Sequence, residues 1–218
     1  MTIEGLDFSG KSTLVRALKG LLADTDTHFT REPGGTPVAE RIRDIVLDPN
    51  AEMDAWTEAY LYAAARADHA RAEILPRLER GGDVVCERYL DSSLAYQGVG
   101  RGLGLEAVRH LNSYAVGAAM PDRTFYLRLD PEERERRAAR LGAPPDRIEA
   151  VGADFMQRVE EGFEALTGQD TERIEVLDAS RSPIELAEQV IERMRELHYT
   201  RGGESFGEHG PQTGPEQE

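Results

Sequence analysis

The sequence predicts an α/β fold in which a five-stranded parallel sheet is flanked by helices in a three-layer arrangement. Short apolar runs alternate along the chain with helical patterns, which is typical of repeated βα units. The chain has 218 residues, enough for one domain with a full core. The expected strands are Thr2–Glu4, Thr27–Thr30, Asp83–Cys86, Thr124–Leu129 and Ile174–Leu177.

The sequence predicts where two of the helices begin. Asp130-Pro131-Glu132-Glu133 and Ser182-Pro183-Ile184-Glu185 each combine a capping side chain, proline at the first helical position and a glutamate two residues later. The alanine-rich stretch from Asp54 to Arg80 predicts one long helix, bent near Pro76. Residues 1–199 therefore form the predicted domain, and Thr200–Glu218, with almost no apolar residue, form a predicted disordered acidic tail.

Charge and composition argue against several classes of partner and location. Asp and Glu number 41 against 26 Lys and Arg, so the net charge of −15 argues against a nucleic-acid partner. The single cysteine, Cys86, excludes an internal disulfide, and neither a membrane span nor a leader is evident; we expect a cytoplasmic protein without membrane contact. Lys11 and Lys19 are the only lysines among the 26 cationic residues, so the rest are arginines. A high-salt or GC-rich host would explain this preference for arginine, and so would coding bias alone; both explanations stay open.

The strongest motif follows the first predicted strand. Gly5-Leu6-Asp7-Phe8-Ser9-Gly10-Lys11-Ser12 satisfies G-x-x-x-x-G-K-[ST] in a strand, loop and helix context, and Thr13 follows it. In such a P-loop the backbone N–H groups surround a polyphosphate, the lysine reaches the outer phosphates, and the serine hydroxyl binds Mg²⁺. The motif predicts binding of ATP with Mg²⁺; a glycine-rich turn without a ligand is the alternative.

Two further arginine motifs follow predicted strands. Thr30-Arg31-Glu32-Pro33-Gly34-Gly35-Thr36 follows the second strand, and Cys86-Glu87-Arg88-Tyr89 ends the third. Parallel sheets bind ligands at this edge, so Arg31 and Arg88 predict an acceptor that carries a phosphate monoester. The alternative is that both arginines form surface ion pairs.

These motifs, in this order, resemble thymidylate kinase. The resemblance rests on the P-loop, on Phe29–Thr36, on Glu87–Gly98 and, less strongly, on Asp146-Arg147-Ile148-Glu149. It implies a P-loop fold of the nucleoside monophosphate kinase type and transfer of the terminal phosphate of ATP to dTMP to give dTDP. It also implies a homodimer. The alternatives are a kinase of another deoxynucleoside monophosphate, such as dUMP, and a relative that binds nucleotides without turnover.

The resemblance also assigns the acceptor site. Asp7 lies near the sugar 3′-hydroxyl, and Arg31 and Arg88 hold the dTMP phosphate. Tyr62 stacks on thymine, and Arg66, one helical turn later on the same face, donates to the base. The remaining expected contacts, to the base, its neighbouring backbone and the 2′ position of the sugar, come from Ser93, Gln97 and Tyr96.

Four arginines after the fourth strand, at positions 134, 136, 137 and 140, resemble the lid that closes over ATP, which we place at about 134–147. Arg137 and Arg140 are the expected catalytic residues there, beside Lys11 and Arg88, because an arginine can neutralise charge on the transferred phosphoryl group. A solvated helix face is the alternative for two of the four.

Three departures from the family pattern stand out. Phe8 is bulky for a loop around phosphate, and it must point away from the phosphates if ATP affinity is to be kept. Glu87, expected with Ser12 at the metal, replaces the commoner aspartate. The first strand begins almost at Met1, so the true start of the protein could lie upstream.

Overall fold

The computed structural model describes residues 1–142 and 146–200. Its five strands form one parallel sheet in the order β2-β3-β1-β4-β5. The strands are β1 (Thr2–Glu4), β2 (Thr27–Arg31), β3 (Asp83–Glu87), β4 (Thr124–Arg128) and β5 (Ile174–Asp178). All five predicted strands are therefore confirmed, with ends that differ from the prediction by one residue at most.

The helices in the described residues follow in chain order. They are α1 (Lys11–Leu21), α2 (Pro37–Leu47), α3 (Ala55–His69), α4 (Leu75–Leu78), α5 (Leu90–Ser93), α6 (Leu105–Val116), α7 (Pro131–Leu141), α8 (Ala153–Gln169) and α9 (Pro183–Thr200), with π-helical η1 (Ala70–Ile74) and η2 (Leu94–Gly100) and the 3₁₀ turn η3 (Glu149–Val151). The expected long helix is thus a continuous α3-η1-α4 run in which a π segment precedes Pro76.

Helix ends follow the sequence signals. The Asp130 carboxylate accepts hydrogen bonds from the N–H groups of Glu132 and Glu133, and so caps α7. Ser182 and Glu185 cap each other reciprocally at the start of α9. This last helix continues through Thr200, one residue beyond the predicted domain boundary. The rest of the predicted tail lies outside the described residues.

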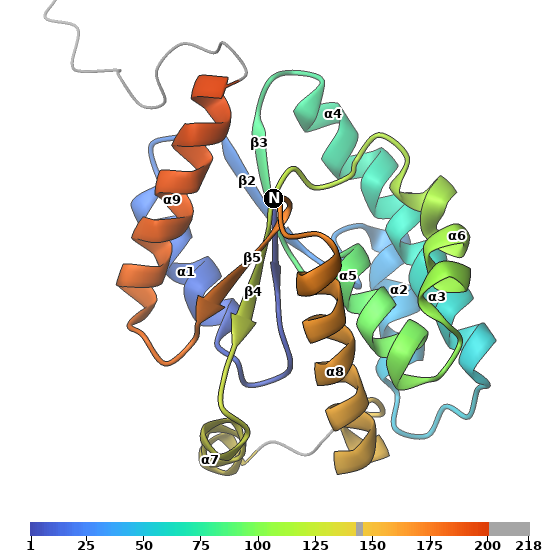
Figure 1. Cartoon of the computed structure of the whole chain (residues 1–218). Helices are drawn as coiled ribbons and strands as arrows, with labels where there is room; N and C mark the ends of the chain where they lie inside the picture. The colour runs from blue at the N-terminus through green and yellow to red at the C-terminus, as the bar shows by residue number, and fades with distance from the viewer. Residues whose placement is uncertain (143–145, 201–218) are drawn as a thin grey trace, which may run out of the picture.

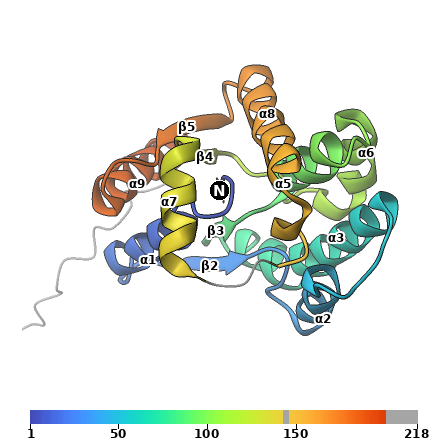
Figure 2. The same cartoon turned by 90° about the horizontal axis from the view of Figure 1, so that it is seen from below.

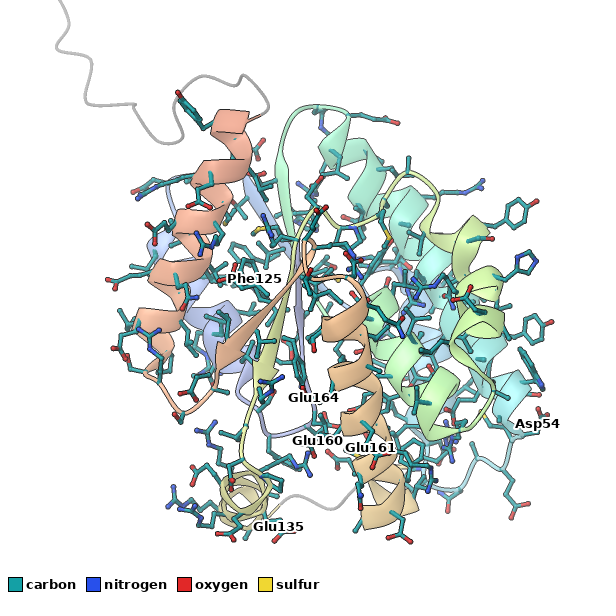
Figure 3. The ribbon with its side chains drawn as sticks, in the orientation of Figure 1. Asp54, Phe125, Glu135, Glu160, Glu161 and Glu164 are labelled. Carbon is teal, nitrogen blue, oxygen red and sulfur yellow. The ribbon has the colours of Figure 1, made fainter. Side chains whose placement is uncertain are left out.

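Two apolar layers enclose the sheet. Figure 1 shows α1 and α9 on one face and α2–α6 with α8 on the other. Phe125 of β4 is fully buried on the α1/α9 side (Figure 3), whereas Tyr126, its neighbour in sequence, packs on the opposite side against Phe163 of α8. Adjacent strand residues thus point to opposite faces of the sheet, and buried apolar side chains cover both faces.

The carboxyl ends of the strands meet at one edge of the sheet, and α7 lies across that edge (Figures 1 and 2). Because β1 lies between β3 and β4, the loops that follow β1 and β3 are neighbours. The two strongest sequence motifs, which occupy these loops, are thereby brought together.

Close packing of α8 on η2 predicts a stability effect. A Cβ added at Gly162 of α8 would lie 3.0 Å from Ala95 Cα and 3.1 Å from Val99 Cβ. Gly162→Ala should therefore lower the free energy of unfolding by about 1 to 3 kcal/mol through overpacking. Gly168→Ala in the same helix is the matched control, because a Cβ there meets nothing within 4 Å. Denaturant unfolding measures both variants, and equal stabilities would contradict the close approach.

Candidate active site

The loop after β1 has the backbone of a phosphate-binding loop. Gly5 has φ +145° and Gly10, which caps α1, has φ +100°. A Cβ at Gly5 would lie only 2.9 Å from the carbonyl oxygen of Leu127, so only glycine fits there. The N–H groups that open α1 consequently face the large cavity that the loop lines.

Phe8 also takes a left-handed conformation, with φ +65°. Such a backbone is costly for a bulky residue. The side chain is half-buried and borders the large cavity. The condition that Phe8 points away from the phosphates stays a prediction.

Lys11 lies deep in this loop. Its side chain is 5% exposed, and its ammonium group donates to the Leu6 carbonyl oxygen at 2.6 Å. Burial and the neighbouring charge of Arg88 lower the pKa of Lys11 to about 8. A phosphate placed beside it would supply the missing counter-charge.

Ser12 and Glu87 meet at the carboxyl ends of β1 and β3. The Ser12 hydroxyl donates to Glu87 Oε1 at 2.7 Å, so the longer side chain of glutamate reaches the expected place. One hydroxyl and one carboxylate oxygen suit Mg²⁺, which typically takes few protein ligands and completes its shell with water and phosphate. Among the described residues, no group of three or more His, Cys, Asp or Glu could hold a metal ion.

Arg88 connects the two loops. Its guanidinium donates to the Gly5 carbonyl oxygen at 2.9 Å and to Asp7 Oδ1 at 2.5 Å, and it lies over the Tyr96 ring at 5.3 Å. Burial opposes the charge of Asp7, but Arg88 and Lys11 together hold the pKa of this carboxyl below its usual range. The Tyr96 hydroxyl donates to the other carboxylate oxygen at 3.3 Å.

Glu4, which was not predicted as a site residue, supports the turn that follows β3. Its buried carboxylate accepts the N–H groups of Tyr89 and Ser92, at 2.7 and 3.2 Å. Burial and Asp91 raise the pKa of Glu4 to about 7. The residue is a carboxylate in a fully buried strand, directly before the P-loop, and that was the available signal.

Two cavities meet at Arg88. The larger, of about 900 Å³, is lined by the P-loop, and the smaller, of about 110 Å³, lies between α3, η2 and the loop after β2. Both cavities are lined by Asp7, Glu32, Arg43, Arg88 and Asp146. A donor and an acceptor could therefore lie end to end, with their reacting groups beside Asp7 and Arg88.

The smaller cavity contains the expected base-binding residues. Tyr62, Arg66, Ser93, Tyr96 and Gln97 all line it. Burial raises the pKa values of Tyr62 and Tyr96, so both phenols remain neutral at physiological pH. The structure thus brings these residues of α3, α5 and η2 together around one cavity, and their contact with a base stays a prediction.

Gln97 is held by a residue that the sequence did not single out. Its amide donates to Glu58 Oε1 at 2.9 Å, and the same buried carboxylate pairs with Arg101 and Arg147, each at 2.8 Å. Arg147 belongs to the fourth resemblance element. Glu58 thus connects the acceptor cavity to the end of the predicted lid segment.

Arg31 lies apart from the small cavity. It lines only the larger cavity, is 48% exposed, and pairs with Glu40 at 2.9 Å. Arg43 of α2, which sequence reasoning missed, lines both cavities and donates to the Pro33 carbonyl oxygen. In this structure Arg43 is therefore the second arginine beside Arg88 at the junction, while a role for Arg31 stays a prediction.

The lid arginines divide into two pairs. Arg137 and Arg140 line the larger cavity, and Arg137 donates to the carbonyl oxygens of Ser9, at 3.5 Å, and Ala179, at 3.1 Å. Arg134 instead pairs with Glu160 of α8, and Arg136 with Glu133. Glu160 lies on the side of α8 near α7 (Figure 3). Residues 143–145 of the predicted lid lie outside the described residues.

Fold and site together define a P-loop kinase with a second, adjoining cavity for an acceptor. The family model for thymidylate kinase matches residues 3–191, and the chain belongs to this family. The resemblance inferred from the motifs is confirmed.

Individual relatives agree with this assignment. Thymidylate kinase of Symbiobacterium thermophilum is 46% identical over 200 residues, which cover 90% of this chain and 92% of that protein. The enzyme of Deinococcus radiodurans is 44% identical over 192 residues, covering 87% and 93%. The crystal structure of thymidylate kinase from Ehrlichia chaffeensis matches with a TM-score of 0.69 and 28% identity, covering 89% of this chain and 96% of that chain.

The lowered pKa of Lys11 predicts a pH dependence. A lysine is charged below its pKa, so kcat/KM for ATP should fall as the pH rises through about 8, by about tenfold per unit once the free enzyme is mostly neutral at this position. Rates measured between pH 6 and 10 test this. Lys11→Arg is the matched control, since arginine keeps its charge and should remove the decline. A parent profile that stays flat to pH 9.5 would contradict it.

Proposed function

We propose that this chain transfers the terminal phosphate of ATP to dTMP, giving ADP and dTDP. One observation carries the proposal: a P-loop cavity and a smaller cavity lined by Tyr62 and Arg66 share a wall at Asp7 and Arg88. The larger cavity suits the triphosphate, and the smaller suits a base with its sugar. Thymidylate kinases are the relatives that this chain resembles along most of its length.

The acceptor site reads the base by shape and by one hydrogen-bond donor. Tyr62 offers a stacking face, and Leu47 and Ile148 supply apolar walls suited to a thymine methyl group. Arg66 presents N–H donors, which match a keto oxygen and oppose the amino group of cytosine. Tyr96, held by Asp7, crowds the sugar and favours deoxyribose.

The transfer step needs position and charge. The acceptor phosphate is already anionic, so no general base is required, and catalysis rests on alignment and neutralisation. Lys11 neutralises the transferred group from the P-loop side, Arg88 from the acceptor side, and Arg137 and Arg140 from α7. Ser12 and Glu87 would hold Mg²⁺, which supplies charge neutralisation between the phosphates when bound.

We further propose a homodimer in the cytoplasm. Helices α2, α3 and α6 adjoin one another (Figure 1), and each carries exposed apolar side chains of the kind found at interaction surfaces. These side chains are Val38, Ile45, Trp56, Tyr60 and Tyr114. Among the described residues no helix is long and apolar enough to cross a membrane.

A coupled assay with ATP, Mg²⁺ and a panel of dTMP, dUMP, dCMP and dGMP tests the function. ADP release should be fastest with dTMP and should be abolished in Lys11→Ala. Preferred turnover of dUMP would support the alternative acceptor, and ATP binding without ADP release would support a non-catalytic relative.

Base choice is predicted to depend on Arg66. Arg66→Ala should lower the preference for dTMP over dCMP by about 1 to 3 kcal/mol, because an unmatched polar contact costs that amount. Ratios of kcat/KM for the two acceptors measure it. An unchanged ratio would show that Arg66 does not read the base.

The α7 arginines are predicted to act in the transition state. The double variant Arg137→Gln/Arg140→Gln should lower kcat by at least about a hundredfold while the Kd of dTMP stays nearly constant, because the acceptor cavity is built from other segments. Arg134→Gln/Arg136→Gln is the matched control, since neither residue lines a cavity. A near-normal kcat in the first variant, or weakened dTMP binding, would contradict this role.

A further inference from the structure

Behind Arg66 lies a buried polar cluster that the transfer chemistry does not use. Glu32 is 5% exposed and His69 is fully buried, and they come from the loop after β2 and from the end of α3. Glu32, which also lines both cavities, contacts Arg66, and His69 contacts Glu32. Buried polar groups of this kind are retained only when each has a partner.

The Glu32 carboxylate is shared between two donors. Its Oε2 atom accepts from Arg66 Nε at 2.8 Å, and its Oε1 atom lies 3.0 Å from His69 Nδ1. The other ring nitrogen, His69 Nε2, lies 2.7 Å from the Thr30 hydroxyl. With the proton on Nδ1, the ring donates to Glu32 and accepts from Thr30, so one tautomer satisfies both contacts.

The Arg66 guanidinium is consequently fixed in its plane. Besides Glu32, it donates to Ser93 at 2.9 Å, to the Tyr89 carbonyl oxygen at 2.8 Å and to Asn112 of α6. These contacts use four of its five N–H donors and leave one on Nη2 for a ligand in the small cavity that Arg66 lines. Because the guanidinium is planar and rigid, the direction of this last Nη2 donor depends on where Glu32 holds the Nε atom of Arg66.

The second glycine of the Gly34-Gly35 pair packs against this cluster. A Cβ at Gly35 would lie 2.6 Å from both Cδ2 and Nε2 of His69, and the residue has φ +89°. Any larger residue would displace the imidazole. Gly35 therefore leaves room for His69 beside Glu32, a role that phosphate binding does not require.

We propose that Glu32 and His69 are positioning residues that set the base selectivity of the acceptor pocket by orienting Arg66. The inference deepens the proposed function and rests on it. His69 itself lines neither of the two cavities, and it contacts Glu32, which lines both, so its effect on the substrate passes through Glu32 and Arg66. Loss of the contact from His69 Nδ1 should allow the Glu32 carboxylate to rotate. The Arg66 guanidinium that it holds should then rotate as well.

Two substitutions of His69 separate its two contacts. In His69→Asn the amide nitrogen takes the place of Nδ1, so the contact with Glu32 is kept and that with Thr30 is lost. In His69→Gln the amide nitrogen takes the place of Nε2, so the contact with Thr30 is kept and that with Glu32 is lost. Both variants remove the ring, which makes each the packing control for the other.

The readout is the ratio of kcat/KM for dTMP to that for dCMP, with thermal unfolding of each variant. We expect His69→Gln to lower the ratio at least about tenfold, mainly through KM for dTMP, and His69→Asn to keep it within about threefold of the parent. Equal ratios in both variants, whether unchanged or reduced alike, would overturn the inference.

Failure of the parent chain to phosphorylate dTMP would instead overturn the proposed function itself. If His69→Gln does not fold, Glu32→Asp replaces it, because the shorter side chain withdraws the carboxylate from Arg66. The same tenfold loss of selectivity is expected, and a parental ratio in Glu32→Asp would overturn the inference.

Discussion

The contact between Arg88 and the loop after β1 is the constraint on which the site depends. Parallel pairing of β1 with β3 places the two loops side by side, and Arg88 then bonds both Gly5 and Asp7. Asp7 pairs with Arg88 and lies 4.0 Å from Lys11 Nζ, so the two buried cations share this carboxylate at the junction of the two cavities. Burial of a cation is costly, and a bound phosphate would add counter-charge there.

This local arrangement reconciles an acidic chain with anionic substrates. The net charge is −15, yet arginines from several elements line the larger cavity. They are Arg31, Arg43, Arg88, Arg137, Arg140 and Arg181. Carboxylates elsewhere are engaged in ion pairs that hold elements in place, such as Glu160 with Arg134 between α8 and α7. The field at the site is therefore set by nearby groups, and the total charge says little about the ligand.

Those parts of the structure that depend on local signals could be predicted from the sequence. The P-loop, the strands, the capping of α7 and the shared helix face of Tyr62 and Arg66 all follow from residues close together in the chain. The partners of buried charges could not be predicted, because they lie far apart in sequence: Glu32 is 34 residues from Arg66, and Glu4 is 88 from Ser92. Arg31 shows the same limit, since its pairing with Glu40 depends on how α2 packs. Motif spacing identifies which residues reach the site, and tertiary packing decides what each one contacts.

We expect a donor and an acceptor to bind end to end across the junction at Asp7 and Arg88. Isothermal titration with adenosine and thymidine joined by a polyphosphate bridge measures this, because one molecule then occupies both cavities. Such a compound should bind at least about a hundredfold more tightly than ATP or dTMP alone, since the second contact becomes intramolecular. An affinity no greater than that of the single nucleotides would show that the two cavities do not form one continuous site.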